Sequence, residues 1–132
     1  MGEGMEHIKQ GFLMEIKQND DYLFIALKAM GKLTYHDYQT LVLEIELALD
    51  SLAVRKIKAL VDVTQLTGWT LRALWEDCKF GLRHRKTFIK VAIYGAKGRY
   101  KYAALVGQLF ISGEMKYFEQ QDEAFGWVSE TR

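Results

Sequence analysis

Short apolar runs that alternate with segments of helical spacing are the feature that most restricts the fold of this chain. The apolar runs occupy residues 12–17, 22–28, 57–63, 88–94 and 115–118. From residue 34 onward, segments whose apolar residues recur every three or four positions separate these runs, and one more follows the last run. The first pattern is typical of strands and the second of helices. The predicted order is ββαβαβαβα, a single α/β domain with a five-stranded sheet.

The first two predicted strands form a hairpin, and the later strands pair in parallel. Asn19 and Asp20 are turn formers that separate the first two runs, which makes these strands antiparallel. Strands joined through a helix pair in parallel by right-handed crossovers, so a mixed sheet is expected. Lys58, Asp62 and Lys90 make one face of the third and fourth strands more polar. We therefore expect the helices to lie mainly on one face of the sheet.

The segment after Gly31 carries the clearest helix signal in the sequence. Thr34 and Asp37 stand three residues apart, as in a capping box, just before the helical periodicity begins. The residues on one helical face are Tyr38, Leu41, Val42, Ile45, Leu49 and Leu52. This face is predicted to pack on the sheet.

Three further helices are predicted along the chain. The second covers about 70–84, the third covers 99–111, and the fourth follows the last strand. Asp122 is predicted to cap the fourth helix. Its predicted anchors are Phe125, Trp127 and Val128.

Length and composition favour one compact domain. A chain of 132 residues with 49% hydrophobic residues can bury a core without metals or disulfides. A net charge of +1 supplies no field for nucleic acid or an anionic membrane surface. No apolar run approaches the roughly 20 residues of a membrane span, and the first residues lack the apolar stretch of a signal peptide. We expect a cytoplasmic protein with a flexible tail at residues 1–10 and one domain at residues 11–132.

No motif in the sequence predicts catalysis, a cofactor or a metal. His7, His36 and His84 have no carboxylate or cysteine at metal-ligand spacing. The lone cysteine, Cys78, lies within a helical pattern and is expected to pack in the core. No nucleophile–base pair is recognisable among Asp62, Glu76, Asp77 and Cys78. We therefore expect a protein without enzyme activity, cofactor or metal.

The sequence LTGWT, residues 66–70, is the first candidate site. It is expected to form the turn between the third strand and the second helix, and ligands of α/β proteins usually bind at such strand ends. Gly68 permits backbone angles closed to other residues, and Thr70 is placed to cap the helix. The free N–H groups beside Thr70 suit an anion. An ordinary helix cap is the alternative for this turn, and it involves no ligand.

The second predicted helix has apolar residues on both of its sides. Its core face is assigned to Leu71, Leu74, Trp75, Cys78 and Leu82. The opposite side carries Trp69, Ala73, Phe80 and His84. Because that side is too aromatic for a solvated surface, we expect Trp69 and Phe80 to contact a ligand, a partner or a second subunit.

The third predicted helix has more apolar surface than one core contact can bury. One face has Tyr100, Ala103, Ala104, Gly107 and Ile111, and most of the other has Tyr102, Leu105, Val106 and Leu109. We expect it to form one wall of an apolar cleft, with Trp69 and Phe80 on the other wall. Lys97 and Arg99 are placed near the mouth, and an amphipathic molecule or a homodimer partner fills the cleft. In the alternative, the last helix and the C-terminal segment cover this surface, and the two basic residues belong to an ordinary turn.

Three stretches of the sequence resemble one known family. They are GKLTYHDY at residues 31–38, GWTLRALWEDCKFGLRHRK at residues 68–86 and GEMKYF at residues 113–118. With the order of elements, they resemble the SpoIIAA-like proteins of the STAS superfamily, which are related in structure to CRAL-TRIO lipid-binding domains. The resemblance covers about residues 12–130 and implies a β-α superhelical fold without established enzyme activity.

The resemblance also implies a second function to set beside ligand binding. Regulatory members of the superfamily carry an Asp-Ser-Ser-Gly turn in which a partner kinase phosphorylates a serine. The corresponding LTGWT has no serine, and Thr67 lies nearest the acceptor position, with Thr70 as the other hydroxyl. We therefore expect either a module that binds a small apolar or amphipathic, lipid-like ligand, or a regulatory protein-interaction module of the anti-sigma-factor-antagonist type.

Overall fold

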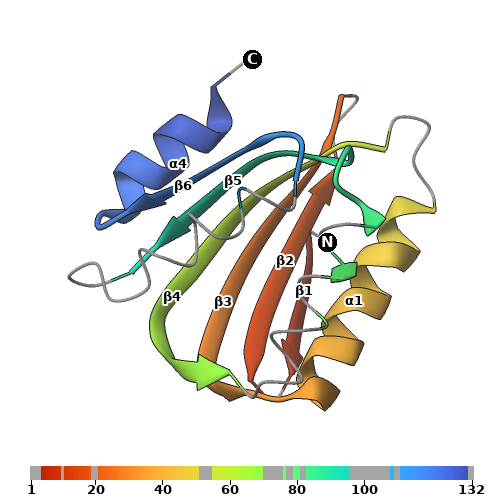
Figure 1. The fold of residues 1–132 in the computed structure, drawn as a ribbon, viewed down its shortest axis with the longest axis vertical. Helices are drawn as coiled ribbons and strands as arrows, with labels where there is room; N and C mark the ends of the chain where they lie inside the picture. The colour runs from red at the N-terminus through yellow and green to blue at the C-terminus, as the bar shows by residue number, and fades with distance from the viewer. Residues whose placement is uncertain are drawn as a thin grey trace.

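The computed structural model describes residues 4–9, 11–18, 21–50, 55–69, 76, 79–80, 83–95, 108 and 111–130. Within these residues the fold is a curved sheet with helices on either side (Figure 1). The strands are β1 (Gly4–Lys9), β2 (Phe12–Gln18), β3 (Leu23–Leu33), β4 (Ile57–Trp69), β5 (Phe88–Tyr94) and β6 (Glu114–Phe118). The helices are α1 (Tyr35–Leu49) and α4 (Gln121–Ser129).

The strands follow one another across the sheet in chain order. β1, β2 and β3 are antiparallel neighbours, whereas β3, β4, β5 and β6 are parallel neighbours. Parallel neighbours need a long crossover connection, which explains the segments that separate β3, β4, β5 and β6 in the sequence. The predicted α/β class, the mixed sheet and the five predicted strands are confirmed.

A sixth strand, β1, lies where the sequence predicts a flexible tail. That prediction is wrong for residues 4–9, which pair with β2 in antiparallel register. The chain turns back at Gly11, whose φ of 90° is strained for residues other than glycine. β1 pairs with the outer edge of β2, and such backbone pairing leaves little trace in the side-chain pattern.

β3 and β4 run further than predicted and pair in parallel to their ends. The expected turn in LTGWT is therefore wrong, because residues 66–69 continue β4. The partner of Gly31 is Leu66 and the partner of the next β3 residue is Gly68, so Thr67 is the extra residue of a bulge. Both glycines have positive φ, 68° for Gly31 and 154° for Gly68, which accommodates the irregular register.

Helix α1 covers one face of the sheet and begins as predicted. The Thr34 side chain accepts a hydrogen bond of 3.2 Å from Asp37 N, and the Asp37 carboxylate accepts one of 3.0 Å from Thr34 N. These two bonds form the expected capping box. The helix buries Tyr38, Leu41, Ile45 and Leu49 in the main core, with β-strand residues that include Phe12, Met14, Ile25, Ile57 and Val91. Leu52, the last residue of the predicted face, lies outside the described residues.

Helix α4 covers the opposite face of the sheet (Figure 1). Leu60 and Ala92 pack with Ala124 and Val128 of α4, whereas the neighbours of Leu60 and Ala92 along each strand face the main core. Successive residues of a strand point to opposite faces, so the two helices lie on different sides. α4 is thus an exception to the expected one-sided arrangement of helices.

The start of α4 differs from the prediction. Its N-cap is Gln120, which makes no side-chain capping bond, and Asp122 lies in the first turn, where its charge suits the helix dipole. Among the predicted anchors, Val128 is buried and Trp127 is partly buried, whereas Phe125 is 51% exposed. A two-residue offset is the usual uncertainty of helix ends.

The second and third predicted helices are described only in part. Residues 76, 79, 80 and 83 are helical, in agreement with the second predicted helix. These residues and His84 are called the 76–84 segment below. The third predicted helix lies outside the described residues except for Gln108 and Ile111.

Candidate functional site: a groove beside helix α1

A groove of about 500 Å³ lies between α1 and the 76–84 segment. α1 contributes Tyr35, Tyr38, Gln39, Thr40, Val42, Leu43 and Glu46 to its lining. The 76–84 segment contributes Glu76, Phe80 and Arg83. The lining therefore combines aromatic and aliphatic side chains with hydroxyl, amide and charged groups.

The α1 wall has an apolar edge that extends beyond the groove. Leu43 and Leu47, one helical turn apart, are 57% and 60% exposed. Of these two leucines, Leu43 lines the groove. On the same wall, Gln39 Nε2 donates a hydrogen bond of 3.1 Å to the Tyr35 hydroxyl. Neighbouring exposed leucines at the edge of a groove are typical of a surface that makes apolar contacts.

Phe80 forms the apolar part of the opposite wall and also belongs to the main core. It is 4% exposed. Its ring centroid lies 6.3 Å from that of Tyr38, 5.8 Å from that of Phe88 and 4.7 Å from that of His84. The assignment of Phe80 and His84 to a side away from the core is therefore wrong for Phe80. Tyr38 and Phe88 come from α1 and β5, and a pattern within one helix cannot reveal such neighbours.

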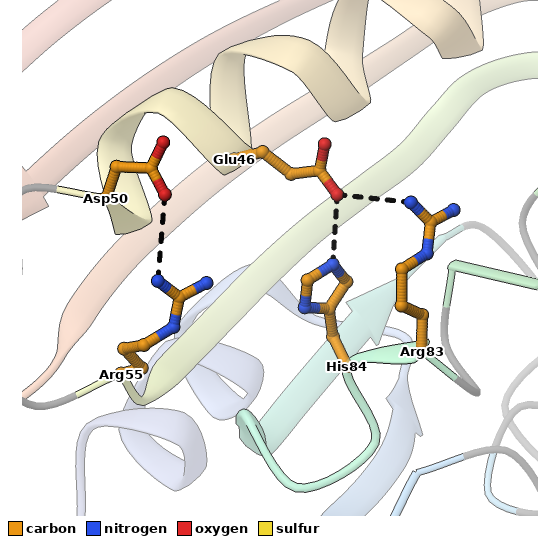
Figure 2. A network of polar contacts seen from close by, with 5 residues as sticks. All are labelled: Glu46, Asp50, Arg55, Arg83 and His84. Carbon is orange, nitrogen blue, oxygen red and sulfur yellow. Dashed lines mark hydrogen bonds and ion pairs between the residues drawn. The ribbon is translucent and has the colours of Figure 1, made fainter.

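A carboxylate on α1 joins the two walls of the groove (Figure 2). Glu46 Oε2 lies 3.3 Å from Arg83 Nη1 and 3.1 Å from His84 Nε2. The Arg83 and Glu46 side chains are 55% and 35% exposed, so water screens this pair and its contribution to stability is about 0–1 kcal/mol. Because both partners meet the same oxygen, the carboxylate positions the 76–84 segment beside α1.

The charged groups around the groove are paired with one another. Besides the Glu46 contacts, Lys79 Nζ lies 3.0 Å from Glu76 Oε2. At the C-terminal end of α1, Asp50 Oδ1 lies 3.7 Å from Arg55 Nη1 (Figure 2). Such a lining suits a ligand with an apolar body and a polar end that forms hydrogen bonds.

Most residues of the predicted sites lie outside the described part of the chain. They are Thr70, Lys97, Arg99, Tyr102, Leu105 and Leu109. Thr67 is exposed in β4, and the structure describes Trp69 by its backbone at the end of that strand. Phe80 lines the groove. The cleft expected between the second and third helices therefore stays a prediction.

The α1 residues of the groove are not among the predicted sites, although the sequence contains a signal for them. Leu43 and Leu47 lie off the helical face assigned to the core, which is the same kind of apolar surplus that singles out the third helix. The partnership of Glu46 with Arg83 has no local signal, because the two residues are 37 positions apart.

The described residues include no cluster of three or more His, Cys, Asp or Glu side chains that could hold a metal ion. Over the same residues, no helix combines the length and the apolar character needed to cross a membrane. The chemical groups that the groove offers are therefore aromatic rings, hydrogen-bond donors and acceptors, and paired charges.

On the opposite face, β4 and β5 hold a tyrosine against a carboxylate. Tyr94 is 8% exposed and forms a hydrogen bond with Asp62, its neighbour across the two strands. Burial, followed by the charge and the hydrogen bond of Asp62, raises the pKa of Tyr94 to about 12. Asp62 also accepts hydrogen bonds from Thr64 N at 2.8 Å and Thr64 Oγ1 at 2.6 Å.

The Tyr94 pair predicts a loss of stability at alkaline pH. An unfolded tyrosine ionises near pH 10, whereas folded Tyr94 keeps its proton up to about pH 12. The contribution of Tyr94 is complete below the lower pKa and is lost as the pH rises toward the higher one. By about pH 11, the wild type should have lost about 1 kcal/mol more unfolding free energy than Tyr94→Phe, measured by urea denaturation. Parallel pH profiles for the two proteins would contradict this account.

The element order, the mixed sheet and the helices on its two faces define the class of the chain as a SpoIIAA-type α/β fold. The chain belongs to the SpoIIAA-like family, whose model matches residues 24–129. The family predicted from the sequence stretches is confirmed.

The solved structures that are similar to this chain include the following two. An uncharacterised DUF3478-family protein with a SpoIIAA-like fold, from Shewanella loihica PV-4, is 37% identical, with a TM-score of 0.75 over 97% of this chain and 98% of that one. The anti-sigma factor antagonist SpoIIAA in its unphosphorylated form is 14% identical, with a TM-score of 0.51 over 89% of this chain and 99% of that one. At this identity the second likeness concerns the fold alone. No curated protein matches the sequence.

Proposed function

We propose that this chain is a non-enzymatic binding module whose site is the groove between α1 and the 76–84 segment. The main support is the groove itself, because its volume of about 500 Å³ falls in the range of small-molecule sites. Tyr35 and Tyr38 supply rings from one wall, and Phe80 supplies a ring from the other. The proposed ligand is a small apolar or amphipathic molecule, which lies against these rings.

The polar groups at the groove favour a ligand whose polar end accepts hydrogen bonds. The Arg83 side chain is 55% exposed, and its contact with Glu46 uses Nη1. A guanidinium has several N–H donors, so Arg83 can also donate to a ligand. Glu76 and Glu46 line the same groove and disfavour a ligand with a high negative charge.

The proposal is tested with two leucines that differ in their relation to the groove. Leu43 and Leu47 have similar exposure on the same helix, and Leu43 is the one that lines the groove. Leu43→Gln is expected to weaken binding of the uncharged fluorescent probe N-phenyl-1-naphthylamine about fivefold, because apolar contact area is lost. Leu47→Gln serves as the matched control and should bind as the wild type does. A wild type that binds no probe, or two variants with equal affinities, would overturn the proposal.

A regulatory protein–protein interaction through residues 67–70 is the second candidate function. The exposure of Thr67 at the β4 bulge favours it, because an exposed residue is accessible to a partner. Phosphorylation confined to Thr67 or Thr70 in cells would support this candidate. A small-molecule adduct retained in native mass spectrometry would support the groove instead. The homodimer and the cleft with Tyr102, Leu105 and Leu109 remain proposals based on the sequence pattern.

A further inference from the structure

Two lysines lie buried side by side near the starts of β4 and β5. Lys58 on β4 and Lys90 on β5 are neighbours across the strands, and they are 3% and 2% exposed. Both belong to the face that α4 covers, since their contacts are with α4 and with Tyr22. Burying two like charges is unfavourable unless hydrogen bonds and opposite charges compensate them.

The compensation comes from the C-terminal end of α4. Lys58 Nζ donates a hydrogen bond of 2.6 Å to the Glu130 carbonyl oxygen. Lys90 Nζ donates one of 2.8 Å to the Trp127 carbonyl oxygen and lies 3.4 Å from Glu130 Oε1. The last carbonyls of a helix lack partners within the helix and carry its partial negative charge. α4 has no basic residue in its last turn, so these strand lysines supply the positive charge.

Aromatic rings complete the surroundings of the two ammonium groups. Lys90 Nζ lies 4.6 Å from the Trp127 ring centroid, and Lys58 Nζ lies 4.6 Å from that of Tyr22. Burial, followed by repulsion from Lys90, lowers the pKa of Lys58, while the Glu130 carboxylate acts in the opposite direction. With α4 docked, the two ammonium groups therefore contact two carbonyl oxygens, a carboxylate oxygen and two aromatic rings.

α4 has little stability of its own. It has nine residues, and helices of this length are marginal in water. Gly126 lies in its interior, and its N-cap makes no side-chain hydrogen bond. Among its residues, Ala124 and Val128 are buried. They pack in a cluster with Leu60, Ala92 and Tyr94 that is separate from the main core beneath α1.

We propose that α4 can detach from the sheet while the rest of the domain stays folded. We also propose that Lys58 and Lys90 hold the C-terminal end of α4 on the sheet through their hydrogen bonds. Because the cluster under α4 is separate from the main core, α4 can leave while α1 and the sheet stay folded. Release removes the carbonyl partners of both lysines and exposes Leu60, Ala92 and Tyr94. Detachment of α4 therefore controls access to a face of the sheet that carries two ammonium groups beside apolar side chains.

Native-state hydrogen exchange of the full chain tests this proposal. In the wild type, two open states are compared by their equilibrium populations. The open state that exposes the amides of residues 124–129 is expected to be at least tenfold more populated than the open state that exposes the α1 amides. The double substitution Lys58→Met with Lys90→Met should accelerate exchange in α4 by a further tenfold or more and leave α1 unchanged. Lys116→Met is the matched control, because Lys116 is an exposed β6 lysine 5.9 Å from the Trp127 ring. It should match the wild type.

Several outcomes would overturn the proposal. Equal protection of α4 and α1 in the wild type would show that α4 opens only when the whole chain unfolds. Acceleration of α1 together with α4 in the double variant would show that the lysines support the whole fold. Unchanged α4 exchange in the double variant would show that Lys58 and Lys90 do not hold α4 on the sheet. The wild-type comparison of the two helices decides the first point even if the double variant fails to fold.

Discussion

The substitution Ile45→Asp is expected to lower the free energy of unfolding by about 4 kcal/mol or more. Ile45 is 5% exposed and lies between Leu41 and Leu49 on the buried side of α1. An aspartate at this position loses the apolar contacts of isoleucine. It also either buries an unpaired charge or takes up a proton, and both are unfavourable. Urea denaturation followed by far-UV circular dichroism measures the change.

Leu47→Asp provides the matched control for Ile45→Asp. Leu47 is two residues further along the same helix and is 60% exposed. The intrinsic helix propensity lost on substitution with aspartate is similar at both positions, so it nearly cancels in the comparison. The control should lose no more than about 1 kcal/mol, since surface substitutions have small effects. Equal losses in the two variants would show that the packing of α1 on the sheet has been assigned incorrectly.

The parts of the fold that local patterns determine are predictable from the sequence. The bounds predicted for β5, Phe88–Tyr94, match the structure, because an apolar run buried on both faces is easily recognised. The start of α1 is also predicted, since Thr34 and Asp37 cap it through groups three residues apart. These elements depend on residues that are close together in the sequence.

The parts of the fold that depend on pairing between distant strands are not predictable in the same way. β1 is held by backbone hydrogen bonds to β2, and the extension of β4 through Thr67 is held by pairing with β3. Backbone groups are the same in every residue except proline, so side-chain patterns report this pairing weakly. Gly68, a turn signal in the sequence, instead accommodates an irregular register within a strand.

The candidate groove was partly accessible to sequence reasoning. Leu43 and Leu47 lie outside the core face of α1, so an apolar surplus on this helix can be read from helical spacing alone. The contacts of Glu46 with Arg83 and His84 join residues 37 and 38 positions apart, and only the fold brings them together. The same limit applies to Lys58, whose partner at Glu130 is 72 positions away.

The second helix has two interpretations, and they predict different effects of truncating Phe80 on the stability of the fold. If its ring served mainly as a ligand or partner contact, truncation would change binding and leave the fold largely intact. In the structure the ring is 4% exposed and contacts Tyr38, His84 and Phe88. These neighbours lie on α1, in the 76–84 segment itself and on β5. The ring therefore fills the junction between α1, this segment and the sheet.

Phe80→Ala is accordingly expected to lower the free energy of unfolding by about 3–5 kcal/mol, because the substitution removes a buried ring and leaves a cavity among aromatic neighbours. Phe125→Ala is the control, since Phe125 is 51% exposed and its ring meets Phe24 edge-on at 6.2 Å. The control should lose roughly 1 kcal/mol or less, in line with a partly exposed aromatic pair. Chemical denaturation of both variants gives the comparison. A loss for Phe80→Ala no larger than that of the control would contradict its place in the main core and restore the interpretation of Phe80 as a surface contact.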